Sequence, residues 1–260
     1  MWLPFLGPRI NGGSEAMLEP DLRDEDLWIM MPTLSVEEVP SLLVHPAAKE
    51  QHILKLLARR DLPGETLGLI AHSRWVGTLR IQCALVNHPN TPPPDALNFV
   101  KFLFWRDLNQ VAVNFQLATE VRHFAEQVLF LRLPAMAAGE KISLARLAAG
   151  QVLKGLRHDK DPKVVQALLE NSRCVEEDVL FLVSQQRTPA PVLEAVAKDP
   201  KWSARREVRI ALLRNARTPL SSAAAFISSL TSVEAKSLVN DGKVPLAVRR
   251  LLQSRLKKTP

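Results

Sequence analysis

Tyrosine is absent from this chain of 260 residues, and aromatic residues make up only 5% of it. β-Sheets draw much of their stability from aromatic and β-branched side chains paired across neighbouring strands. Leucine, alanine and valine dominate this sequence instead, which suits the packing of helix on helix. The composition therefore predicts an all-α fold, and the 47% hydrophobic content is enough for a continuous core.

Cysteine is scarcer still than the aromatic residues. Cys83 and Cys174 are the only two, and the sequence contains no C-x-x-C pair. A structural zinc or iron–sulfur site needs about four sulfur or imidazole ligands at close spacing, so none is predicted. Each cysteine lies in or beside an apolar helical run, which indicates a small buried side chain and no disulfide framework.

Long apolar runs are missing as well. No stretch approaches the ~18 apolar residues of a membrane span, and the first residues lack the basic start and apolar core of a secretory signal. Neither a glycine-rich phosphate-binding pattern nor the G-x-S-x-G nucleophile pattern occurs. We therefore expect a cytoplasmic protein with no membrane span, no metal or cofactor and no catalytic residue.

The most informative feature that is present is an internal repeat. Residues 75–92, WVGTLRIQCALVNHPNTP, align without a gap with residues 202–219, WSARREVRIALLRNARTP, at an offset of 127 residues. The alignment pairs Trp75 with Trp202, Thr91 with Thr218 and Pro92 with Pro219. Self-similarity on this scale indicates a repeat architecture.

Each copy carries its own signals for the end of one helix and the start of the next. The first copy has an apolar run that ends at Asn87, which tolerates the left-handed conformation common after helices, and Pro89 cannot continue the helix. We expect the Thr91 hydroxyl to accept a hydrogen bond from the next helix, with Pro92 just after this cap. The same punctuation recurs at Asn215, Thr218 and Pro219, and in reduced form at residues 185–189. Each copy therefore predicts two short antiparallel helices.

The remaining apolar stripes extend this pattern along the chain. We expect further helices at about 52–60, 66–71, 95–104, 108–114, 120–131, 143–156, 164–170, 175–185, 190–198, 205–214, 220–230, 233–239 and 246–256. Together they make about seven helix pairs over residues 46–256. Residues 134–141 interrupt the pattern and are either a degenerate repeat or a hinge between two arrays.

The first 45 residues have a different character. They contain several prolines, and residues 1–41 hold eight acidic and two basic side chains, a net charge of −6. We expect an irregular acidic arm with one short helix near residues 36–43. The apolar letters LWIMM at residues 27–31 either pack on the arm's own repeats as a cap or bind a partner.

The run Asn87-His88-Pro89-Asn90-Thr91-Pro92, followed by an apolar helix, resembles the leucine-rich repeat variant family and, more broadly, the HEAT-like, armadillo-type α-solenoids. The resemblance implies an α-solenoid over residues 46–256. Some members of the variant family hold an iron–sulfur cluster through cysteines ahead of the repeats, and residues 1–44 contain none. HEAT-type metal hydroxylases use repeated His-Glu pairs, and none of the six histidines here precedes a glutamate.

Positive charge is concentrated in the last quarter of the chain. Residues 198–260 hold fourteen basic and four acidic side chains, a net charge of +10. The candidate anion-binding residues are Arg205, Arg206, Arg209, Arg249 and Arg250. The sequence equally allows a solvated face of the last repeats, with no ligand at all.

Three functions remain open from the sequence. The first is a non-catalytic scaffold for protein–protein interaction, with an acidic protein or peptide as partner. The second is nucleic-acid binding through the same arginines. The third is an enzyme on a HEAT-like scaffold, similar to the HEAT-like DNA glycosylases, for which Trp105, Arg106 and Asp107 would be the candidate pocket; the recurrence of Trp75 and Trp202 at equivalent positions points instead to structural tryptophans.

Overall fold

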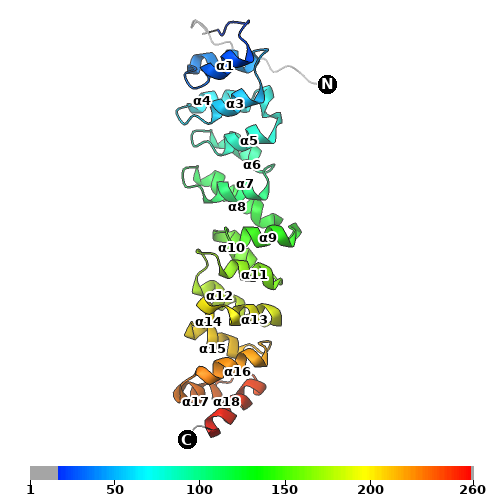
Figure 1. Cartoon of the computed structure of the whole chain (residues 1–260), viewed down its shortest axis with the longest axis vertical. Coiled ribbons are helices and arrows are strands. Elements are labelled where there is room, and N and C mark those ends of the chain that lie inside the picture. Colours follow the sequence, from blue (N-terminus) through cyan, green and yellow to red (C-terminus); the bar gives the residue numbers. More distant parts are fainter. Residues whose placement is uncertain (1–16, 259–260) are drawn as a thin grey trace. The chain divides into compact units, whose positions relative to one another are not determined.

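The computed structural model describes residues 17–258, and every regular element within that range is a helix (Figure 1). The predicted all-α fold is therefore confirmed. The helices form two compact units. The first unit runs to Asp107 and includes Asn114–Arg122, and the second comprises Leu108–Val113 and the chain from His123 onward.

The first unit is a sequence of short helices. They are α1 (Asp24–Met30), the 3₁₀ turn η1 (Val36–Glu38), α2 (Val39–Val44), α3 (Glu50–Leu57), α4 (Gly64–Ala71), the 3₁₀ turn η2 (Arg74–Gly77), α5 (Leu79–Val86) and α6 (Pro93–Val100). α7 (Trp105–Val113) and α8 (Thr119–Arg132) each contribute residues to both units. Within the first unit α5 packs against α3 and α6.

The short helix expected near residues 36–43 is present as η1 and α2, and the described part of the arm has one further helix, α1, that was not expected. Leu27 and Met31 are fully buried in the same apolar core as α3 to α5. Two side chains of α3 or its end hold the arm in place: Lys55 Nζ donates to the Trp28 carbonyl at 2.9 Å, and Arg59 Nη1 donates to the Leu34 carbonyl at 2.6 Å. The described part of the arm is thus a cap on the helices that follow it. The irregular structure expected for residues 1–16 lies outside the described residues.

The second unit is also built from short helices joined by loops. Its elements are the 3₁₀ turn η3 (Leu133–Ala135), α9 (Ala138–Ala145), α10 (Gly150–Leu156), α11 (Pro162–Leu169), α12 (Glu176–Ser184), α13 (Ala190–Lys198), α14 (Pro200–Ser203), α15 (Arg206–Arg214), α16 (Leu220–Ser229), α17 (Ser232–Val239) and α18 (Leu246–Lys258). α11 packs against α9 and α13, α12 packs against α15, and α18 packs against α16 and α17. Each helix therefore contacts elements close to it in the chain.

Two predicted helices have different bounds in the structure. The one expected at 95–104 ends at Val100, and Phe102 and Phe104 are 53% and 65% exposed beyond it. The one expected at 143–156 is two helices, α9 and α10, separated by a loop over residues 146–149. The expected interruption at 134–141 is mostly ordered, since η3 and the first half of α9 occupy it.

Gly150 explains why α9 does not run on into α10. It has a φ of +49°, a left-handed conformation that favours glycine, and a Cβ added there would collide with the Glu126 carboxylate. That carboxylate accepts a hydrogen bond from the backbone N–H of Gln151, in the first turn of α10. Glu126 on α8 thus supplies an anion to the positive end of α10.

We expect the substitution Gly150→Ala to lower the free energy of unfolding of the second unit by about 2 kcal/mol, because alanine is strained at positive φ and displaces Glu126. Urea unfolding followed by circular dichroism measures the change. Gly139→Ala is the matched control, since a Cβ at Gly139 in α9 meets nothing within 4 Å and alanine favours a helix. Equal stability of Gly150→Ala and the wild type would contradict the proposed constraint.

Candidate interaction surface

The residues that signal the end of one helix and the start of the next correspond to one recurring type of loop. In seven loops of the described chain the backbone N–H of one residue donates to the carbonyl of the residue three positions earlier, which we call the anchor. The anchors are His45, His88, Asn114, Asn171, Gln185, Asn215 and Asp241, and the donors are Ala48, Thr91, Leu117, Cys174, Thr188, Thr218 and Val244. The loops therefore share this backbone hydrogen bond even where their residues differ.

The anchor side chain ties its loop to an earlier one. In the first unit His88 contacts the Arg59 carbonyl through Nε2 at 2.7 Å and accepts a hydrogen bond from the Asn90 N–H at its Nδ1 atom. In the second unit Asn215 Nδ2 donates to the carbonyls of Val183 at 2.7 Å and Gln185 at 3.1 Å. Histidine and asparagine each offer one donor and one acceptor here, so two unlike residue types play the same part.

Two further anchors repeat this arrangement. His45 Nε2 contacts the Glu19 carbonyl at 3.0 Å, and Asn171 Nδ2 donates to the Ala145 carbonyl at 2.8 Å. All four of these side chains, those of His45, His88, Asn171 and Asn215, are buried. This role could not be predicted from the sequence, because the partner carbonyl lies about one helix pair away in the chain.

The expected role of Thr91 and Thr218 as helix caps is wrong. Their hydroxyls donate to the carbonyls of Leu85 and Leu212, both at 2.6 Å, and so close the end of the preceding helix. The cap positions of the following helices belong to Pro92 and Pro219, which make no side-chain hydrogen bond. The threonines thus stabilise the helix before the loop instead of the helix after it.

Asn87 also differs from its expected conformation. Its φ is −84°, in the right-handed region, and no non-glycine residue among residues 17–258 has a positive φ. The side-chain amide donates to the Cys83 carbonyl at 2.9 Å, four residues earlier in α5. Asn87 therefore ends its helix through a hydrogen bond and not through a left-handed turn.

Trp75 and Trp202 occupy equivalent places in the two units. The indole N–H of Trp75 donates to the Leu43 carbonyl at 2.9 Å, and that of Trp202 donates to the Leu169 carbonyl at 3.1 Å. Both carbonyls lie two residues before an anchor. A cation covers each ring, Arg74 at 4.7 Å and Lys201 at 4.1 Å from the ring centroid. The two tryptophans do the same structural work.

The arginines at the start of α15 are already compensated by carboxylates. Arg206 forms ion pairs with Glu207 at 2.8 Å and Glu234 at 2.9 Å, and the hydrogen bond that it donates to Glu234 raises the pKa of its guanidinium. The pKa of Glu234 falls to about 2, first through the Thr231 backbone N–H and then through Arg206. Arg205 lies 3.8 Å from Glu176. These charges are poorly placed to hold a further anion.

The side chains of the other three predicted arginines have different surroundings. Arg209 is half-buried and donates to the Ser229 hydroxyl at 3.3 Å. Arg249 Nη2 donates to the carbonyls of Asp241 at 3.0 Å and Val244 at 3.2 Å, so it braces the loop between α17 and α18. Arg250 is exposed and forms no ion pair within the described part of the chain. The five candidates therefore do not form one free basic stripe.

Sequence reasoning missed another set of cations, which we call the basic loop row: Arg187, Arg217 and Lys243. Each lies two residues after an anchor and two residues before a proline, in QQRTP, NARTP and DGKVP. All three are exposed, and none forms an ion pair with any residue from 17 to 258. The signal was present in the sequence as a basic residue at a fixed place in the loop.

Backbone contacts place these loops side by side. Arg217 Nη1 donates to the Arg187 carbonyl at 3.4 Å, while Asn215 Nδ2 bonds to Gln185 in the same pair of loops. Lys243 lines one cavity with Gln186 and Arg214. The C-terminal ends of α12, α15 and α17 thus meet at one end of the helices, and the basic loop row runs across them.

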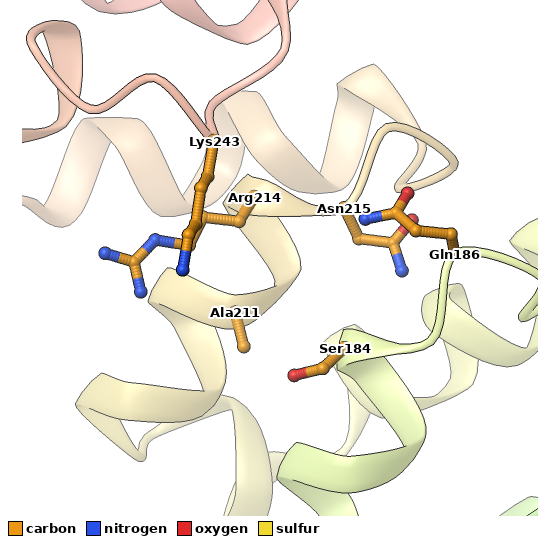
Figure 2. Close-up of a pocket in the computed structure, with 6 residues that line it drawn as sticks. All are labelled: Ser184, Gln186, Ala211, Arg214, Asn215 and Lys243. Carbon is orange, nitrogen blue, oxygen red and sulfur yellow. The ribbon is translucent and has the colours of Figure 1, made fainter.

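A cavity of about 360 Å³ lies within this group of loops (Figure 2). Its lining consists of Ser184, Gln186, Ala211, Arg214, Asn215 and Lys243. Figure 2 shows the Lys243 side chain reaching down from its loop toward Arg214, with the Ser184 hydroxyl directed into the space below Ala211. The cavity therefore offers ammonium, guanidinium and hydroxyl donors to a ligand.

One carboxylate partly balances these donors. Arg214 Nε lies 2.7 Å from Asp241 Oδ2, and the pKa of Asp241 is lowered by the Lys243 backbone N–H and then by Arg214. With two cations and one nearby carboxylate, the cavity keeps an excess of positive charge. Arg187 and Arg217 add to it from the neighbouring loops.

The other cysteine and acidic residues considered as functional candidates have structural roles. Burial raises the pKa of the Cys83 and Cys174 thiols to about 11, which disfavours the nucleophilic thiolate. The acidic residues Glu176, Glu177 and Asp178 occupy the first turn of α12, and Asp178 pairs with Arg157 at 3.0 Å. Within residues 17–258, no three His, Cys, Asp or Glu side chains are grouped so as to hold a metal, and no helix has the length and apolarity to cross a membrane.

Comparison with protein-family models, with curated proteins and with solved structures returned no match to this chain.

Proposed function

We propose that this chain is a non-catalytic α-solenoid scaffold whose basic loop row binds an acidic segment of another protein. The helix pairs supply a repeating framework, and the loops at one end of α12, α15 and α17 supply the binding surface. The partner's carboxylates would meet Arg187, Arg217 and Lys243, with the adjoining cavity taking one of them.

The solenoid part of this proposal draws support from the reach of the anchors. His45, His88, Asn171 and Asn215 bond to carbonyls that lie 26, 29, 26 and 32 residues earlier. This is the length of one helix pair, and stacked repeats bond mainly to their neighbours. Such a period favours a leucine-rich-repeat-variant or HEAT-like array of about seven pairs.

The observation that carries the binding proposal is the contrast between two sets of cations in the second unit. Arg205 and Arg206 face carboxylates, whereas the basic loop row forms no ion pair with any residue that the structure describes, although all its members are exposed. Charges left unpaired on adjacent loops produce a local positive potential. Such a potential steers an acidic partner and fixes its orientation.

The variant Arg187→Glu/Arg217→Glu/Lys243→Glu is expected to bind fluorescein-labelled polyglutamate about 100-fold more weakly than the wild type, since three exposed charge contacts of about 1 kcal/mol each are lost. Fluorescence anisotropy of the full chain at low salt measures the affinity. The control variant Arg205→Glu/Lys236→Glu/Arg250→Glu changes the net charge equally but leaves the row intact, so it should lose less than about fivefold.

Two results would overturn the proposal. One is equal weakening by both variants, which would mean that net charge alone drives binding. The other is tighter binding of labelled single-stranded DNA or RNA than of polyglutamate at the same salt, with a steep salt dependence. The second result would instead place nucleic-acid binding at the basic loop row. Circular dichroism of each variant shows that the fold is retained.

A further inference from the structure

We infer that the basic loop row recognises an extended, polyproline-II-like segment with an acidic side chain at every third residue. This inference rests on the proposed function and adds to it the spacing and conformation of the ligand. It follows from three features of the second unit: the separation of the loops, their fixed backbones and the donors in the cavity.

The separation of the loops sets the spacing of the cations. Each of the three loops follows the end of one helix, and α12 and α15 pack directly against each other. Packed helices lie about 8–10 Å apart, so Arg187 and Arg217 start from backbones separated by about that distance. The ion pair between Arg214 Nε and Asp241 Oδ2 at 2.7 Å links the end of α15 to the loop of Lys243, which is therefore the next loop in the row. The bond between Arg217 and the Arg187 carbonyl agrees with loops that are immediate neighbours.

An extended peptide matches this spacing without bending. In the polyproline II conformation the chain has three residues per turn and rises about 3.1 Å per residue. Every third side chain therefore lies on the same face, about 9 Å from the next. A β-strand places every third residue on opposite faces, because its side chains alternate, so that conformation fits the row less well.

The loops are held in place before any ligand arrives. Asn215, buried, fixes the loop of Arg217, whose own N–H donates to Asn215 Oδ1 at 3.0 Å. The loop of Lys243 is fixed in the same way, by its N–H donating to Asp241 Oδ1 at 2.9 Å and by the two bonds from Arg249. A rigid backbone lowers the ordering cost of binding and makes affinity depend on register.

The cavity gives the segment a place for one carboxylate. Lys243 approaches it from a loop and Arg214 from the end of α15, and the Ser184 hydroxyl points into it from the end of α12 (Figure 2). A carboxylate there accepts charge-assisted hydrogen bonds, which are stronger than neutral ones. The flanking acidic side chains of the segment then reach Arg187 and Arg217.

Three labelled peptides of identical composition test the inference on the full chain. Each contains five glutamates, five prolines and five serines, arranged as five Glu-Pro-Ser repeats, as one block of glutamates, or with glutamate at every second position. Anisotropy at fixed low salt should show the every-third peptide binding about tenfold more tightly than the other two. Proline keeps these peptides from forming helices.

The variant Arg217→Gln removes the middle cation and should reduce this preference to less than about twofold, whereas Arg250→Gln should preserve it. Equal affinity of all three peptides for the wild type would overturn the inference and leave the proposed function standing. Failure of every acidic peptide to bind would overturn the proposed function itself. The two failures are therefore distinguishable.

Discussion

Replacing Trp202 with alanine is expected to lower the free energy of unfolding of the second unit by about 4 kcal/mol. Trp202 is only 2% exposed, and its indole donates to the Leu169 carbonyl at the end of α11. The substitution removes a large apolar surface from the core and leaves that carbonyl unpaired. Urea denaturation monitored by circular dichroism gives the difference in free energy.

Trp202→Phe separates the two contributions to this loss. Phenylalanine keeps much of the packing but cannot donate, so the loss should fall to about 1–2 kcal/mol. A loss below about 1 kcal/mol for Trp202→Ala would mean that the tryptophan does not hold α14 against α11. The repeated placement of Trp75 and Trp202 would then need another explanation.

Asn215→Ala should destabilise the second unit by about 3 kcal/mol, because it removes three hydrogen bonds at a site that is buried. Asn215 is 2% exposed and bonds to Val183, Gln185 and the Arg217 N–H. Alanine leaves two carbonyls and one N–H without these partners, and the Val183 carbonyl belongs to a fully buried residue. Thermal unfolding of the purified chain detects the effect as a lower Tm for this unit.

Asn240→Ala is the matched control for this experiment. Asn240 is an exposed asparagine at the end of α17, and its side chain forms no hydrogen bond with the residues that the structure describes. We expect its loss to change the stability by less than about 0.5 kcal/mol. If Asn215→Ala were equally mild, the anchors would not be the bonds that hold adjacent loops together.

The helices could be predicted largely from the sequence, because their signals are local. Apolar residues recur with helical spacing, and proline with threonine marks the loops at residues 88–92 and 215–219. The direction of the threonine hydroxyl could not be predicted in the same way. A hydroxyl both donates and accepts, and only the folded loop shows that the Leu85 carbonyl lies closer to Thr91 than the amides of α6 do.

The candidate site was harder to predict, since charge in a sequence says nothing of its neighbours in space. Arg206 is one of several basic residues in its segment, but its partner Glu234 lies 28 residues further along the chain. The same limit left two alternatives open for residues 27–31, and the structure shows Leu27 and Met31 packed against the helices that follow. The basic loop row could be predicted only from the position of each basic residue within its loop, two residues before a proline.

The bond that four of the anchors make to an earlier part of the chain bears on how such a protein grows. An added helix pair brings its own anchor and offers the next anchor the same backbone carbonyls, whatever residues surround them. Because both histidine and asparagine make this bond, a duplicated segment can keep its fold while its sequence diverges. Tandem gene duplication can therefore lengthen the protein in whole helix pairs, and the two similar segments 127 residues apart are consistent with such an event.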